Sequence, residues 1–163
     1  MLLYLLEHKF SKEVKKANYD YYEKRTLHDS SLSLSTHSIL ASDIDEKDLA
    51  YKLFQEATKI DLGENMKTSD HGIHAASLGG LWQIVVNGFG GVRMVGGNLR
   101  INPKLPENWS RLSFSFMWKG NKLDIELTKE GIKIEVKDEM LEEIEILVYD
   151  TKYVLNQILK IKF

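Results

Sequence analysis

The first half of the chain carries apolar residues at the spacing of amphipathic helices. Four of them recur three or four positions apart and predict a helix over residues 46–60: Leu49, Leu53, Ala57 and Ile60. Ser11 is placed to cap a second helix over residues 12–25, and a short helix is predicted over residues 33–41. The apolar run within residues 1–9 indicates the end of a buried helix.

A further helix, predicted over residues 73–87, has almost no polar face. Apolar side chains occupy most of its positions, and the pair Gly79–Gly80 would allow a neighbouring backbone to approach closely. A helix that is apolar on every side has to be buried on every side. Three or four short helices cannot do this alone. We therefore expect the natural structure to contain more helices than this chain supplies.

After Gly91 the apolar period changes from helical to the two-residue alternation of β-strands. The pair Gly96–Gly97 predicts a hairpin, and further turns are predicted at residues 120–121 and 130–131. Four alternating segments predict strands over residues 111–118, 122–128, 131–137 and 143–149. Their spacing is typical of an antiparallel sandwich or of half a jelly roll.

The two patterns divide the 163 residues into parts of unlike structure. Residues 1–90 are predicted to be helical, and residues 91–163 are predicted to form a small antiparallel β domain. The predicted fold class is therefore α+β. With 43% hydrophobic and 28% charged residues, the composition is that of a globular protein rather than of a disordered chain.

Charge and cysteine content exclude several classes of function. The net charge of −2 provides no overall field to attract nucleic acid or an anionic membrane, so neither partner is expected. The chain has no cysteine, which excludes disulfides, thiolate metal sites and cysteine nucleophiles and is compatible with a reducing cytoplasm. The apolar run after Met1 is too short for a signal peptide or a membrane span.

Polar residues gather in two windows of the helical half, residues 25–37 and residues 67–77, which together hold four of the five histidines. Each window opens a predicted helix, so hydroxyl, imidazole and backbone N–H groups are expected to meet at helix N-termini. Unpaired N–H groups and the helix dipole both favour an anion such as phosphate there. Simple capping by the serines and aspartates is the competing interpretation.

Two other kinds of site are not supported by the spacing. His28, Asp29 and Ser30 are adjacent, whereas the members of a catalytic triad meet in space from separate positions in the sequence. The histidines of the two windows match no known pattern of metal ligands, and capping or hydrogen bonding explains them better: His28, His37, His71 and His74. No metal site is therefore predicted.

Three collinear segments resemble the carboxyl-terminal part of glycoside hydrolase family 65: YYEKRTLHDSSLSLSTHSILA, TSDHGIHAASLGGLWQIVVNGFGGVR and LRINPKLPENWSRLSFSFMWKGNKLDIEL. That family includes maltose, trehalose and kojibiose phosphorylases, and the amino-acid sequence of the second segment is most similar to the kojibiose type. The resemblance implies the last helices of an (α/α)6 barrel followed by a small antiparallel, jelly-roll-like β domain. It also implies an inverting reaction in which inorganic phosphate attacks an α-glucoside and yields β-glucose 1-phosphate.

The resemblance assigns phosphate contacts to four residues: Ser30, Ser31, His74 and Ser77. It places three more in the wall of the substrate pocket: His28, Asp29 and Asp70. It implies no metal and no cofactor, because inorganic phosphate is a co-substrate of the reaction. The family's general-acid glutamate lies upstream of the segments that match, so no catalytic residue is assigned. The chain alone is therefore expected to be inactive.

Two alternatives stay open. Besides the phosphorylase fragment, these are a non-catalytic carbohydrate-binding or structural module that packs on a separate enzyme chain, and a hydrolase variant of the family that uses water. In each case a partner is expected for the helical part, namely the amino-terminal half of the barrel or a second copy in a homo-oligomer. The resemblance further implies an α-glucosyl disaccharide as substrate and a cytoplasmic location, and it leaves the identity of the disaccharide open.

Overall fold

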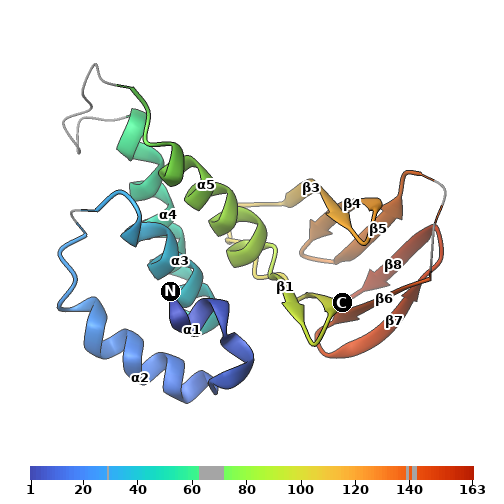
Figure 1. The fold of residues 1–163 in the computed structure, drawn as a ribbon, viewed down its shortest axis with the longest axis horizontal. Helices are drawn as coiled ribbons and strands as arrows, with labels where there is room; N and C mark the ends of the chain where they lie inside the picture. The colour runs from blue at the N-terminus through green and yellow to red at the C-terminus, as the bar shows by residue number, and fades with distance from the viewer. Residues whose placement is uncertain (29, 63–71, 139, 141–142) are drawn as a thin grey trace. The chain divides into compact units, whose positions relative to one another are not determined.

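Figure 1 shows a helical unit and a β unit, Met1–Phe89 and Gly90–Phe163, so the predicted α+β class is confirmed. The computed structural model describes the following residues: 1–28, 30–62, 72–138, 140 and 143–163. Asp29 and Asp70, both predicted to line the pocket, therefore lie outside the described residues. Within the described part of the chain, no helix combines the length and the apolar character needed to cross a membrane.

The helical unit is built from these segments in chain order: α1 (Leu2–Leu5), η1 (Glu7–Lys9), α2 (Lys12–Glu23), α3 (Ser33–Asp43), α4 (Lys47–Leu62), α5 (Ala75–Gln83) and η2 (Ile84–Phe89). The helices predicted over residues 12–25, 33–41 and 46–60 are thereby confirmed as α2, α3 and α4. The side chain of Ser11 caps α2 as predicted, because its hydroxyl accepts a hydrogen bond from the backbone N–H of Val14.

The prediction of a buried helix within residues 1–9 is wrong. The segment forms two single turns, α1 and η1, in which Leu2, Leu5 and Leu6 are exposed. Of its apolar side chains only Tyr4 is buried, and the Tyr4 hydroxyl accepts a hydrogen bond from the Asn87 amide at 2.6 Å. A single turn presents too narrow a face to bury the whole apolar run against the helices that are described.

Helix α3 packs through small residues on both of its long neighbours. The Ser38 hydroxyl donates to the backbone carbonyl of Ala50 in α4 at 2.8 Å. On the side of α5, a Cβ placed on Gly80 would lie 2.7 Å from Ser35 Oγ, whereas one placed on Gly79 would meet nothing within 4 Å. Of the predicted pair, Gly80 is therefore the residue that allows the close approach.

The helix predicted over residues 73–87 is observed as α5 followed by the π-helical turn η2. Ile84, Val86 and Phe89 are buried, but Leu78 and Trp82 are 43% and 50% exposed. The described helices of this chain therefore do not bury it on every side, in agreement with the prediction that a few short helices cannot do so. The described helices α3 and α4 contact one face of α5, which leaves an opposite apolar face open to solvent.

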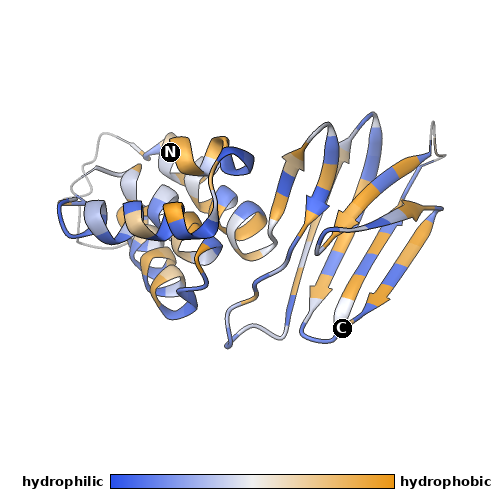
Figure 2. Ribbon diagram, turned by 90° about the horizontal axis from the view of Figure 1, so that it is seen from below, coloured by the Kyte–Doolittle hydropathy of each residue, from blue (hydrophilic) through white to orange (hydrophobic). Residues whose placement is uncertain are grey.

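The β unit contains two four-stranded sheets, with strand orders β1-β2-β6-β7 and β3-β4-β5-β8. The strands are β1 (Val92–Val95), β2 (Asn98–Ile101), β3 (Arg111–Trp118), β4 (Asn121–Thr128), β5 (Gly131–Val136), β6 (Ile144–Val148), β7 (Thr151–Leu155) and β8 (Ile158–Lys162). Buried and exposed positions alternate along most of them, as Figure 2 shows by the change of hydropathy from residue to residue. That alternation is typical of a two-sheet sandwich.

The topology differs from the prediction in two respects. Strands β2 and β6 pair in parallel, with Leu99 opposite Ile146, whereas the other pairings of the described strands are antiparallel. Strands β7 and β8 were not predicted from the sequence. Most of the β unit is thus antiparallel as expected, and its parallel pair joins segments distant in sequence.

Glycines set two local features of the β unit. Gly96 and Gly97, at φ 57° and 81°, form the predicted two-residue hairpin between β1 and β2. Gly91 has φ 65°, and a Cβ there would lie 1.8 Å from the backbone oxygen of Asn102. The chain can therefore pass Asn102 at this point only with glycine.

Candidate functional site

Helix α3 runs parallel to α5 and its continuation η2. Ser35 lies against Gly80, and seven residues further along α3 the Ser42 hydroxyl donates to the backbone carbonyl of Gly88 at 3.1 Å. Because these contacts advance in the same direction along both helices, their amino termini lie at the same end of the pair (Figure 1). The described parts of the two polar windows therefore lie at the same end of this helix pair, where both helix dipoles are positive.

A serine turn begins α3. The Ser30 hydroxyl accepts a hydrogen bond from the backbone N–H of Leu32, and the Ser30 carbonyl accepts from both the N–H and the hydroxyl of Ser33. Ser30 is exposed and Ser31 is half-buried, directly before the helix. The N-cap residue of α3 is Leu32, and no side chain caps the helix, so the capping interpretation does not hold here. Ser30 instead closes the turn that precedes the helix. Its exposed hydroxyl is also accessible to a ligand.

His74 stands at the N-cap position of α5 and is held by Asp61, near the end of α4. The His74 ring atom Nδ1 lies 2.7 Å from Asp61 Oδ1, and the His74 backbone N–H donates to the same oxygen at 3.1 Å. These hydrogen bonds hold the pKa of the Asp61 carboxyl below its ordinary value. With Nδ1–H directed at Asp61, the other ring nitrogen is the one that can reach a ligand. Ser77 lies buried one turn further into α5.

Glu23, the last residue of α2, joins the two histidines of the first window. Its carboxylate lies 3.1 Å from His28 Nε2 and also contacts His37 Nδ1. The two imidazole rings are 4.7 Å apart and nearly perpendicular. Nδ1 of His28 lies 3.1 Å from the Ser33 hydroxyl, so the histidine is held from both sides. The sequence did not predict that Glu23 belongs to this group, because Glu23 lies outside both polar windows.

The remaining sequence candidates fall into three groups. The histidines weighed as metal ligands do not form one cluster among the described residues, because His28 and His37 contact Glu23 whereas His74 contacts Asp61. Arg25 is directed back along α2, with its guanidinium 3.9 Å from the centre of the Tyr21 ring. The third group of candidates, from the second window, lies outside the described residues: Lys67, Ser69, Asp70 and His71.

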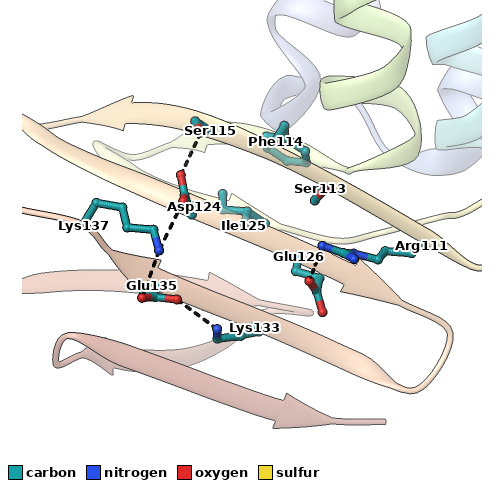
Figure 3. A pocket seen from close by; sticks show the side chains of 10 residues that line it. All are labelled: Arg111, Ser113, Phe114, Ser115, Asp124, Ile125, Glu126, Lys133, Glu135 and Lys137. Carbon is teal, nitrogen blue, oxygen red and sulfur yellow. Dashed lines mark hydrogen bonds and ion pairs between the residues drawn. The ribbon is translucent and has the colours of Figure 1, made fainter.

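The β unit carries a depression of about 380 Å³ on the polar side of β3, β4 and β5 (Figure 3). Its charged side chains pair with one another. Arg111 lies 2.7 Å from Glu126, and Glu135 bridges Lys133 and Lys137 at 2.9 and 3.0 Å. Such mutually neutralised, partly exposed pairs are typical of a solvated sheet face. This depression is therefore a weaker candidate than the end of the α3–α5 pair.

Comparison with known proteins agrees with the observed division into units. Residues 1–83 match the central catalytic domain of glycosyl hydrolase family 65, and residues 92–155 match the C-terminal domain of the same family. The chain belongs to glycosyl hydrolase family 65. Both polar windows fall within the part that matches the catalytic domain.

Several relatives in this family are named phosphorylases. The chain is 46% identical over 159 residues to a kojibiose phosphorylase of Halothermothrix orenii and 44% identical over 157 residues to an α,α-trehalose phosphorylase of Thermoanaerobacter brockii. Each alignment covers 96% of this chain and 20% of the relative. The chain therefore spans about a fifth of the length of these two proteins.

A solved structure described as a putative kojibiose phosphorylase from human microbiome matches with a TM-score of 0.92 at 36% sequence identity. The match covers 99% of this chain and 24% of the solved chain. The family-65 fold of this segment is thus shown by both sequence and structure. The residues that match the catalytic domain are those that form the α3–α5 pair.

Proposed function

We propose that this chain supplies the phosphate-binding side of the active site of an inverting α-glucoside phosphorylase. The observation that carries the proposal is the parallel arrangement of α3 and α5, which brings the Ser30–Ser31 turn and His74 to one end of the helix pair. The phosphorylase names of the family-65 relatives support the reaction class. A phosphate dianion suits this end because two helix N-termini favour negative charge there.

The proposed binding mode uses the polar groups that the two helices present. Hydroxyls of Ser30, Ser31 and Ser77 donate to phosphate oxygens, and protonated His74 donates through Nε2–H while Asp61 accepts from Nδ1–H. Hydrogen bonds to a charged group are stronger than neutral ones, so His74 is expected to contribute most. Asp61 fixes the orientation of the ring and does not itself contact phosphate.

In the proposed reaction, a phosphate oxygen attacks the anomeric carbon of an α-glucoside from the face opposite the leaving oxygen. The new C–O bond forms as the glycosidic bond breaks, and a carboxylic acid transfers its proton to the leaving oxygen. The products are β-glucose 1-phosphate and a free sugar. We assign the acid to a part of the barrel outside this chain, so the chain alone is expected to be inactive. No cofactor takes part.

The substrate is proposed to be an α-glucosyl disaccharide of the kojibiose or trehalose type. These are the sugars named in the relatives that align with 96% of this chain. The absence of cysteine fits a reducing compartment, and we propose a cytoplasmic location for the enzyme.

The binding step is tested by calorimetric titration of the chain with inorganic phosphate. Loss of a hydrogen bond to a charged group costs about 1.5–3 kcal/mol. His74→Gln is therefore expected to weaken phosphate binding by about tenfold to a hundredfold, and Ser77→Ala by less. His8→Gln, at an exposed histidine of η1, serves as the matched control and is expected to bind phosphate as the parent does. Phosphate binding that is equal in the parent and His74→Gln would overturn the assignment.

The reaction is tested by mixing the chain with the upstream barrel half of a related phosphorylase. Phosphate-dependent release of glucose 1-phosphate from kojibiose or trehalose is the expected result. Tight association without any turnover would instead indicate a structural module. Release of free glucose without a need for phosphate would indicate a hydrolase.

A further inference from the structure

The cluster of Glu23, His28 and His37 has features that phosphate binding does not explain. Glu23 ends α2, His37 lies on α3, and His28 lies in the segment between them. One potential ligand atom from each residue lies within 4.8 Å of the other two. The three side chains are about four-fifths buried, with 22%, 20% and 17% of their surface exposed. Three donor groups from three segments of the chain therefore lie close together.

The three donor groups face one another. His28 Nε2 and His37 Nδ1 both point at the Glu23 carboxylate, one at each oxygen, and the two rings stand edge to face. Two imidazole nitrogens and one carboxylate form a ligand set that Zn²⁺ takes in proteins, with a fourth position left for water or another ligand. The residual exposure of the cluster provides access to that fourth position.

A hydrogen bond outside the cluster favours a form of His28 that suits a metal ligand. The Ser33 hydroxyl donates to the Ser30 carbonyl at 3.1 Å, so its oxygen is left to accept a hydrogen bond from His28 Nδ1–H, also at 3.1 Å. With a proton on Nδ1, Nε2 is the atom that faces Glu23: it donates to the carboxylate while it carries a proton, and it can bind a metal ion that displaces that proton. Ligand histidines in metal sites are typically held by such a bond from their second nitrogen.

Two further observations mark the cluster as more than an ion pair. His28 has φ 52°, a left-handed backbone conformation that non-glycine residues adopt rarely and often at functional sites. Tyr19, only 5% exposed, lies against His37, and burial together with the nearby Glu23 carboxylate raises the pKa of its hydroxyl. A buried hydroxyl therefore lies beside the Glu23 carboxylate in this cluster.

We propose that Glu23, His28 and His37 bind one divalent transition-metal ion, of which Zn²⁺ fits the ligand set best. The ion would be structural rather than catalytic. Through His28 and Ser33 it would hold the Ser30 carbonyl and so fix the turn that begins α3. The bound ion would thereby stabilise the proposed phosphate-binding turn without contacting the phosphate. Metal binding by this cluster does not depend on the proposed function and can be tested separately.

The experiment is a calorimetric titration of the full, untagged chain with Zn²⁺ in a buffer that does not chelate metals. Saturable binding of one ion per chain is expected. Glu23→Gln and His37→Gln remove ligands and are each expected to weaken binding by at least about a hundredfold. Ser33→Ala keeps all three ligands and is expected to weaken it by about tenfold to a hundredfold, the usual effect of losing such a supporting bond. His8→Gln serves as the matched surface control and is expected to bind like the parent.

Circular dichroism of each variant separates loss of the site from loss of the fold. Co²⁺ provides a second readout, because its visible absorption spectrum reports coordination by nitrogen and oxygen ligands directly. The absence of Zn²⁺ binding in the folded parent would overturn the proposal and leave the cluster as a His–Glu–His hydrogen-bond network. Binding that survives Glu23→Gln and His37→Gln unchanged would overturn it equally.

Discussion

At the scale of residues, carboxylates from outside the two polar windows orient the histidines inside them. Asp61, at the end of α4, holds His74, and Glu23, at the end of α2, holds His28 and His37. A hydrogen-bonded imidazole has a defined tautomer and ring orientation, which a ligand site requires. The polar windows therefore become a site only when the ends of α2 and α4 are packed beside them.

The contact between Asp61 and His74 predicts a specific dependence of stability on pH. Because the pKa of Asp61 is lowered in the folded chain, the ionised carboxylate stabilises the fold above the ordinary carboxyl pKa of about 4. This contribution is lost as the pH falls through the folded and lowered pKa. Asp61→Asn is thus expected to be less stable than the parent near pH 7 and equal to it in strong acid.

Urea unfolding of both proteins at a series of pH values measures this difference. Asp138→Asn, at an exposed aspartate of the β unit, is the matched control and is expected to follow the parent at every pH. A gap between the parent and Asp61→Asn that stays constant down to strong acid would contradict the role given to the carboxylate.

The sequence located most of the candidate site but not the contacts that organise it. Ser30, Ser31, His74 and Ser77 were selected because they lie in polar windows before predicted helices and match motifs of the family that the sequence resembles. Glu23 and Asp61 were not, because each lies on an amphipathic helix where an acidic residue is expected on the solvated face anyway. Only the packing of α2 and α4 beside the windows reveals their role.

At the scale of elements, the small residues of α3 and α5 set how closely the two helices approach. A Cβ at position 80 would lie 2.7 Å from Ser35 Oγ and 2.9 Å from Ser35 Cβ, whereas position 79 is open. Overpacking of a tight contact costs about 1–3 kcal/mol. Replacing glycine by alanine at an open helical position gains about 0.5–1 kcal/mol.

We therefore expect Gly80→Ala to destabilise the chain by about 1–3 kcal/mol, and Gly79→Ala to stabilise it slightly. Urea unfolding followed by circular dichroism measures both changes, and Gly79→Ala serves as the control for Gly80→Ala. Ser35→Gly removes the atoms that the new methyl group meets and is expected to restore part of the stability of Gly80→Ala. Equal effects at positions 79 and 80 would contradict the close contact between α3 and α5.

The elements that the sequence predicted well are those set by local pattern. Apolar spacing located α2, α3 and α4, and the glycine pair located the hairpin of β1 and β2. The parallel pairing of β2 with β6 had no local signal, because it joins residues about 45 positions apart in the chain. Burial of α5 on all sides was likewise inferred from its composition, whereas the observed neighbours cover one face.

At the scale of the whole molecule, the exposed apolar surface of the helical unit includes parts of α1 and α5. Leu2 and Leu5 of α1 are each 61% exposed, and Leu78 and Trp82 lie on the open face of α5. The family-65 relatives are about five times as long as this chain, and 20% of each aligns with it. We propose that further barrel helices cover these faces in such a protein, and that copies of this chain cover them for one another when it is alone.

The isolated chain is accordingly expected to self-associate, with an average mass that rises with concentration in sedimentation velocity. Burying a large apolar side chain contributes about 1.5–3 kcal/mol. The double variant Leu78→Glu with Trp82→Glu is therefore expected to weaken association by at least about a hundredfold. Met117→Glu, at a methionine of β3 that is 62% exposed, introduces a charge at an apolar site elsewhere and is the matched control. A parent that stays monomeric at all concentrations, or a control that dissociates as readily as the double variant, would show that the open face of α5 does not drive association.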